Sequence, residues 1–161
     1  MLAVLQQTAE GYTARYERHL QHPVEKVWAY LTENDKLKRW FSELEVDLLQ
    51  EGGLIKFDMQ DGTFEELRIL ELRWQEVLEY TWGEDQVRFE LYPEPGGCKL
   101  ILIEKIRQFT DHSPKDLAGW HVCLDVVEDL LEGRAVHERK ERWSVLYPQY
   151  SELISELTQA L

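Results

Sequence analysis

The chain contains 161 residues, of which 43% are hydrophobic and 30% are charged, a mixture typical of one globular domain. Aspartate and glutamate number 31 against 18 lysines and arginines, so the formal net charge is -13. A surface of this charge repels phosphate backbones and anionic lipid headgroups, and no apolar run approaches the roughly 20 residues of a membrane-spanning helix. We therefore expect neither a nucleic acid nor a membrane as a partner.

The start of the chain and its cysteines predict a cytoplasmic location. The first residues, MLAVLQQ, have neither the basic start nor the full apolar stretch of a secretory signal. Cys98 and Cys123 have no paired spacing, which favours free thiols in a reducing compartment over a disulfide framework.

A first strand followed by two short helices is expected near the N-terminus. Residues 12–20 alternate aromatic and polar side chains, as a half-buried strand does. Pro23 fits the first turn of a helix, where its missing N–H costs nothing. Apolar residues then recur at helical spacing, at Val24, Val27, Trp28 and Leu31. A second helix is predicted over 36–41, with Asn34 or Asp35 as its N-cap.

Between residues 43 and 107 the hydrophobic period changes to two, which predicts about six strands. Turn-forming residues separate these strands at Gly52-Gly53, Asp61-Gly62, 83–85 and 93–97, and the last is the clearest break. Because the connections are short, we expect an antiparallel meander rather than parallel strands joined by crossover helices.

One long helix is predicted over Pro114–Glu132. Ser113 is its expected N-cap, and Gly133 fits the position just past its end. At about 1.5 Å per residue, this helix is long enough to cross a whole sheet. Its apolar stripe consists of Leu117, Trp120, Leu124, Val127 and Leu131.

The residues from 134 to 161 form an extension with two features of their own. The first is a group of four basic residues, Arg134, Arg139, Lys140 and Arg142. We expect them either to bind an anion or to form a solvated face that pairs with Glu138 and Glu141. After Pro148 a further helix is predicted, with an apolar stripe at Tyr150, Leu153, Ile154, Leu157 and Leu161. That stripe needs a partner surface, which is either its own domain, near Leu2, Val4 and Leu5, or a second copy in a homodimer.

Five segments occur in an order that resembles a known superfamily, and they are His22–Trp28, Asn34–Phe41, Leu78–Trp82, Gly97–Leu102 and Gly119-Trp120. The chain resembles the SRPBCC superfamily, which includes START and birch-pollen-allergen proteins, and within it the bacterial homologues of the activator of heat-shock-protein-90 ATPase. The resemblance implies an α+β helix-grip fold: a curved antiparallel sheet of about six to seven strands around the long helix. It implies a single domain over 1–161, with a core at 12–133 and a helical C-terminal extension at 134–161.

A curved sheet and a straight helix cannot pack closely along their whole length, so this fold predicts an apolar cavity between them. The bulky side chains expected to border it are Trp40, Phe57, Met59, Trp82, Phe89, Leu102 and Trp120. The alternative is that the same side chains fill a solid core.

Glu104 is the one acidic residue expected among the cavity-lining side chains. On the strand alternation it shares the inner face with Leu100, Leu102 and Ile106. A carboxyl group there needs a partner or must keep its proton, and Arg68 is a candidate partner. If Glu104 faces the cavity, we expect it to anchor a ligand. In the alternative interpretation, Glu104 lies at a strand end and reaches water.

The sequence predicts no metal, no cofactor and no assembled catalytic set. His121 and Asp125 are spaced i, i+4 on the long helix, but a metal site needs further ligands. The sequence contains no nucleophile elbow, zinc-protease motif, phosphate loop or nucleotide fingerprint.

Three functions remain open from the sequence. The first is non-enzymatic binding of an apolar or amphipathic small molecule in the cavity. The second, implied by the resemblance, is a co-chaperone or stress-related interaction protein with a chaperone as partner. The third is a cyclase or hydrolase acting in the same cavity, for which Glu104 would be required.

Overall fold

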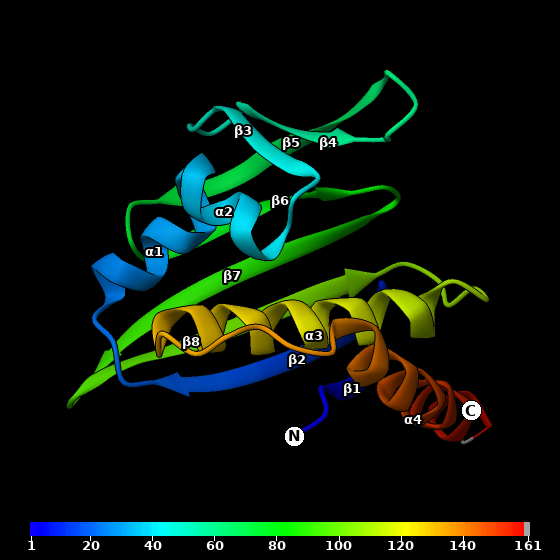
Figure 1. The fold of residues 1–161 in the computed structure, drawn as a ribbon. Helices are drawn as coiled ribbons and strands as arrows, with labels where there is room; N and C mark the ends of the chain where they lie inside the picture. Colours follow the sequence, from blue (N-terminus) through cyan, green and yellow to red (C-terminus); the bar gives the residue numbers. More distant parts are fainter. Residues whose placement is uncertain (160–161) are drawn as a thin grey trace.

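The computed structural model describes residues 1–159, which form eight strands and four helices (Figure 1). The strands are β1 (Val4–Thr8), β2 (Gly11–Leu20), β3 (Leu44–Leu48), β4 (Leu54–Asp58), β5 (Phe64–Arg73), β6 (Val77–Trp82), β7 (Asp85–Glu94) and β8 (Gly97–Ile106). The helices are α1 (Val24–Thr32), α2 (Asn34–Trp40), α3 (Ser113–Leu131) and α4 (Arg139–Gln159).

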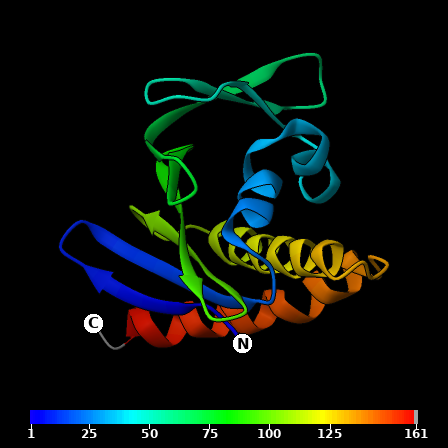
Figure 2. The same cartoon turned by 90° about the vertical axis from the view of Figure 1, so that its left-hand side faces the viewer.

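All strands pair antiparallel in one sheet with the order β1-β2-β8-β7-β6-β5-β4-β3. Figure 2 shows the sheet bending around α3, with α1 and α2 on the same side of the sheet. The α+β helix-grip fold predicted from the sequence is therefore confirmed. Within residues 1–159, no helix is both long and apolar enough to cross a membrane.

The sheet has one strand more than the upper end of the expected range, because β1 was not predicted. β1 forms a hairpin with β2, in which Thr8 pairs with Gly11. Gly11 adopts a positive φ of 146°, and a Cβ there would collide with the carbonyl oxygen of Ile106. Glycine is therefore needed where the hairpin meets the end of β8.

Two predicted helix caps are wrong, although the helices themselves are confirmed. Asn34 lies inside α2, and its amide donates to the carbonyl of Val46 (3.0 Å) and accepts from the N–H of Val46 (2.7 Å). The residue therefore joins α2 to β3 instead of capping the helix. The N-cap of α3 is His112, and the hydroxyl of Ser113 accepts from the N–H of Thr110 (2.9 Å).

The break predicted around residues 93–97 begins later than expected. β7 continues through Pro93 to Glu94, and the turn lies at Pro95-Gly96. The pairing of β6 with β7 ends at Glu90, so the missing N–H of Pro93 removes no hydrogen bond between these strands.

The C-terminal extension folds back onto its own domain. α4 begins at Arg139 and runs through Pro148, so it starts before the proline instead of after it, and it packs on α3 and β1. Leu2 and Leu5 pack against the core beside it, whereas Val4 is 54% exposed. Tyr150 is fully buried, and Leu161 lies outside the described residues.

Three of the four basic residues of the extension, Arg134, Arg139 and Lys140, are exposed, but the ion pairs that form are not the expected ones. Arg134 and Arg142 both pair with Asp129, at 3.1 Å each. Arg139 donates to the carbonyl of Trp40 (3.1 Å) and contacts the sulfur of Cys123. The pairing predicted with Glu138 and Glu141 is therefore wrong, because Asp129 near the end of α3 lies within reach.

A buried chain of hydrogen bonds holds α4 in place. The N–H of Ala3 donates to the hydroxyl of Tyr150 (2.9 Å), and this hydroxyl donates to Nδ1 of His121 (2.7 Å). Burial, with smaller contributions from Arg18 and the N-terminal amine, lowers the pKa of His121 to about 4 and so keeps its imidazole neutral as an acceptor.

Replacing Tyr150 by phenylalanine should lower the free energy of unfolding by about 2 kcal/mol, because it leaves Ala3 and His121 with buried unpaired groups. Urea unfolding at pH 7 measures the change. Tyr147→Phe makes the same substitution on the half-buried side chain one turn earlier and should cost much less. Equal losses in the two variants would contradict this role of Tyr150.

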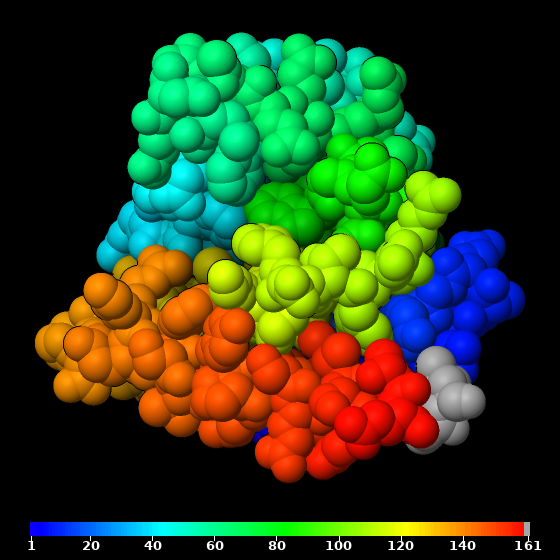
Figure 3. Space-filling view, turned by 90° about the vertical axis from the view of Figure 1, so that its right-hand side faces the viewer, coloured from blue at the N-terminus to red at the C-terminus, as the bar shows by residue number. Residues whose placement is uncertain are grey.

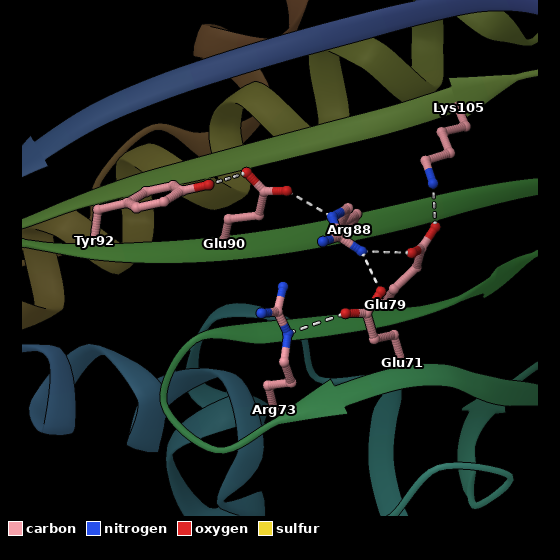
Figure 4. Close-up of polar contacts among 7 residues, drawn as sticks. All are labelled: Glu71, Arg73, Glu79, Arg88, Glu90, Tyr92 and Lys105. Atoms are coloured by element: carbon pink, nitrogen blue, oxygen red, sulfur yellow. Dashed lines mark hydrogen bonds and ion pairs between the residues drawn. The ribbon is translucent and has the colours of Figure 1, made fainter.

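The outer face of the sheet carries an ionic network centred on Arg88 (Figure 4). The guanidinium of Arg88 contacts three carboxylates, those of Glu71 (2.8 Å), Glu79 (2.9 Å) and Glu90 (2.6 Å). Lys105 also binds Glu79, which is only 5% exposed, at 2.7 Å. The network connects β5, β6, β7 and β8 on the side of the sheet opposite α3.

Candidate functional site

A cleft of about 570 Å³ opens where the β6–β7 turn and the loop after β8 approach the first turn of α3. In Figure 3 the surface is recessed between the green segments of β5–β7 and the yellow-green segment that leads into α3. Residues from β4, β5, β6, β8 and α3 line the cleft, among them Phe57, Met59, Leu67, Trp82, Glu104, Ile106 and Asp116.

Glu104 lies at the wall of this cleft because β8 alternates its side chains across the sheet. It shares the inner face with Leu102 and Ile106, and its neighbours on the adjacent strands are Ala14 and Val87. Neither neighbour has a polar side chain, and Glu104 is only 1% exposed. The inner position predicted from the alternation is confirmed, and the alternative of a strand end reaching water is wrong.

The Glu104 carboxyl is a buried group that accepts no hydrogen bond. Within residues 1–159, no donor reaches either of its oxygens. Burial, followed by a hydrogen bond to the carboxyl of Asp116 and by the charges of Asp116 and Asp85, raises the pKa of Glu104 well above its usual range. The expected partner, Arg68, is exposed on the outer face of β5, because the inner positions of that strand are Leu67 and Ile69.

A hydrogen bond between Trp82 and Asp116 crosses the site. The indole N–H of Trp82, on β6, donates to the Asp116 carboxylate in the first turn of α3 (3.0 Å). The ring of Trp82 also packs against Phe57 (5.6 Å between centroids) and Trp120 (4.9 Å). This contact holds the start of α3 against the sheet.

A second cleft of about 580 Å³ lies between α2, α3 and the start of α4, and four of its residues also line the first. The shared residues are Phe57, Trp82, His112 and Asp116. The Trp82–Asp116 pair therefore lies between the two clefts.

The structure brings most of the expected cavity residues to these clefts. Phe57, Met59, Trp82 and Glu104 line the first, and Trp40, Phe57, Trp82 and Trp120 line the second. Phe89 and Leu102 line neither cleft and are buried in the core. Phe89 packs against Trp40 (6.4 Å) and Trp120 (6.0 Å), which separate it from the second cleft.

Sequence reasoning did not identify the acidic residues that face Glu104. Asp116 lies in the first turn of the predicted long helix and Asp85 in a predicted turn, and neither position indicated a role in the site. Asp116 and Trp82 are 34 residues apart, and neither periodicity nor motif spacing indicates that they meet. Only the pairing of sheet and helix brings them together.

The remaining candidate groups belong to the core. The His121 Nε2 lies 3.7 Å from Asp125, and the other ring nitrogen accepts from Tyr150. Cys98 and Cys123 are free and buried, and burial raises their pKa values to about 11 and about 12. Thiols with such pKa values are poor nucleophiles at neutral pH.

Comparisons with solved structures show the same fold in bacterial proteins. A conserved protein of unknown function from Enterococcus faecalis has 27% identity and a TM-score of 0.86, covering 96% of this chain and 91% of its own. CalU16 from Micromonospora echinospora has 21% identity and a TM-score of 0.69, covering 93% and 94%. A protein from Bordetella parapertussis has 23% identity and a TM-score of 0.73, covering 94% and 90%.

No protein with a curated function matches the sequence significantly. The profile of the family described as Activator of Hsp90 ATPase homolog 1-like protein matches residues 21–132, which include α1 through α3 and six of the strands, β3 to β8. The matched segment is more than half of the chain, and it contains the inner face of β8 and the first turn of α3. The chain therefore belongs to the Activator of Hsp90 ATPase homolog 1-like family, within the SRPBCC superfamily.

Proposed function

We propose that the protein binds an apolar or amphipathic small molecule in the cleft beside Glu104, without converting it chemically. The fold of the family supports a ligand-binding or co-chaperone-like role in general. The observation that supports the small molecule is Glu104 itself. A buried carboxyl whose oxygens accept from no donor costs free energy, and a ligand group that donates to it would offset that cost.

The surroundings of Glu104 define the shape of the proposed ligand. Leu67 and Ile106 offer apolar surface, and the rings of Phe57 and Trp82 offer flat aromatic walls. A volume of about 570 Å³ lies within the range of small-molecule sites, which are mostly apolar with a few polar groups. The ligand would place its polar group at Glu104 and its body against these walls.

The test is binding of a lipid and aromatic compound library, followed by native mass spectrometry of the protein. We expect at least one compound to be retained and to shift the indole N–H resonance of Trp82 in NMR spectra. The resonance of Trp74, which is 64% exposed and outside this cleft, should stay in place. If no compound is retained, or if only Trp74 responds, the proposal is wrong; recovery of a chemically altered compound would indicate an enzyme instead.

The co-chaperone role remains a second candidate, because the family match supports it. The stress-related role and the chaperone partner both depend on that match. Pull-down from a bacterial lysate should then enrich a chaperone, and Glu104→Leu should retain the chaperone if the contact lies on the acidic surface. Failure to enrich any chaperone would remove this candidate without affecting the cleft.

A further inference from the structure

The cleft beside Glu104 contains an excess of carboxyl groups. Five acidic residues contribute to its lining, namely Glu65, Glu84, Asp85, Glu104 and Asp116. The two basic residues among its lining are Arg107 and His112. Within the chain as described, the site is therefore negative, in a protein whose net charge is already -13.

Arg107, the basic residue of the lining that is always charged, does not neutralise the carboxyls of Glu104 and Asp116. The guanidinium of Arg107 is 76% exposed and pairs with Glu84 at the rim (3.4 Å), while its backbone N–H donates to Asp85 (2.9 Å). Within residues 1–159, Asp116 accepts from the neutral indole N–H of Trp82 and shares a hydrogen bond with the carboxyl of Glu104, and neither contact supplies a positive charge. Glu104 and Asp116 thus face the cleft without a cationic partner.

We propose that the ligand is a hydrophobic organic amine, whose ammonium group lies between Glu104 and Asp116 and whose body packs against Phe57 and Trp82. This inference depends on the proposed function and specifies its ligand class. An ammonium group donates several charge-assisted hydrogen bonds, so it can satisfy both unpaired oxygens of Glu104. The aromatic faces beside it add a favourable cation–π contribution.

Binding of an amine changes the protonation of the site. In the free protein Glu104 keeps its proton, because burial and the carboxyls of Asp116 and Asp85 disfavour a further negative charge and raise its pKa. An ammonium group beside it reverses that preference, so the carboxyl ionises and releases its proton to solvent. Other titratable groups surround Glu104: Tyr16 on β2, Glu65 on β5, Glu84 in the β6–β7 turn, Asp85 on β7, Asp116 on α3, and Arg107 and His112 in the loop between β8 and α3.

The experiment compares three probes of one shape: 1-naphthylmethylamine, 1-naphthalenemethanol and 1-naphthoic acid. Isothermal titration at pH 7.5, in two buffers of different ionisation enthalpy, measures affinity and proton release together. We expect the amine to bind at least about tenfold more tightly than the alcohol, and the acid to bind most weakly. Proton release should accompany binding of the amine and be absent with the alcohol.

Matched variants assign the effect to Glu104. Glu104→Gln and Asp116→Asn should each bring the amine-to-alcohol affinity ratio toward one, and Glu104→Gln should also remove the proton release. Glu66→Gln, on the exposed outer face of β5, should leave both unchanged. If the alcohol binds as tightly as the amine, the amine inference is wrong and the proposed function stands. If none of the probes binds, the amine inference is also wrong, and the library screen alone decides the proposed function.

Discussion

Replacing Arg88 by methionine should lower the free energy of unfolding by about 3 kcal/mol. Methionine keeps much of the apolar volume of the arginine stem, so the loss reports mainly on charge. Without the guanidinium, the side chain of Glu79 remains 6% exposed with only Lys105 as its partner. Breaking a buried ion pair typically costs about 3–5 kcal/mol of unfolding free energy. We expect a loss at the low end of this range because Lys105 still pairs with Glu79 in the variant.

Arg73→Met provides the matched control for that measurement. Arg73 contacts the same carboxylate, that of Glu71, but its side chain is 56% exposed. Exposed pairs contribute about 0–1 kcal/mol, so urea unfolding at pH 7 should show a much smaller loss. Comparable losses in the two variants would contradict the central role of Arg88.

The effect of Arg88→Met should also diminish in acid. A hydrogen bond from Arg88 lowers the pKa of Glu71; for Glu90, burial raises the pKa but the hydrogen bond from Arg88 outweighs it. Because these folded-state pKa values are depressed, the stability they contribute is present above pH 4.5 and is lost as the pH falls through them. The two unfolding curves should therefore converge below pH 4.5.

The order of the elements could be predicted because each depends on local periodicity. The change from helical spacing at Val24–Leu31 to alternation after residue 43, and back to helical spacing after Pro114, reflects which side chains each element buries. Gly133, with a φ of 71°, ends α3 where its lack of a side chain allows that backbone. Strand β1 was missed because Val4–Thr8 buries little and is held mainly by pairing with β2.

The candidate site was predictable only in part. The alternation along β8 placed Glu104 on the inner face, because that pattern is a property of one strand. Its surroundings depend on where α3 crosses the sheet, which no local pattern encodes. The sequence does not show which face of the sheet Arg68 occupies, so its assignment as the partner of Glu104 was wrong, and the neighbouring Asp116 was overlooked.

A second large effect is expected at Glu104, where Glu104→Met should raise the free energy of unfolding at pH 8 by about 2 kcal/mol. The variant removes a buried carboxyl that accepts from no donor within residues 1–159 and replaces it with an apolar side chain of similar length. Such a gain would show that the carboxyl is retained at a cost in stability, as is common for groups that bind ligands.

The sign of the pH dependence follows from the raised pKa of Glu104, which burial and the carboxyls of Asp116 and Asp85 cause. Between the ordinary value of 4.5 and the higher folded-state value, the folded protein binds a proton that the unfolded chain has lost, so stability falls as the pH rises. Glu104→Gln should remove this component of the slope, whereas Glu66→Gln should retain it. Urea unfolding at pH 5, 6, 7 and 8 measures the slopes, and parallel curves for the wild type and Glu104→Gln would mean that Glu104 titrates as an ordinary exposed carboxyl.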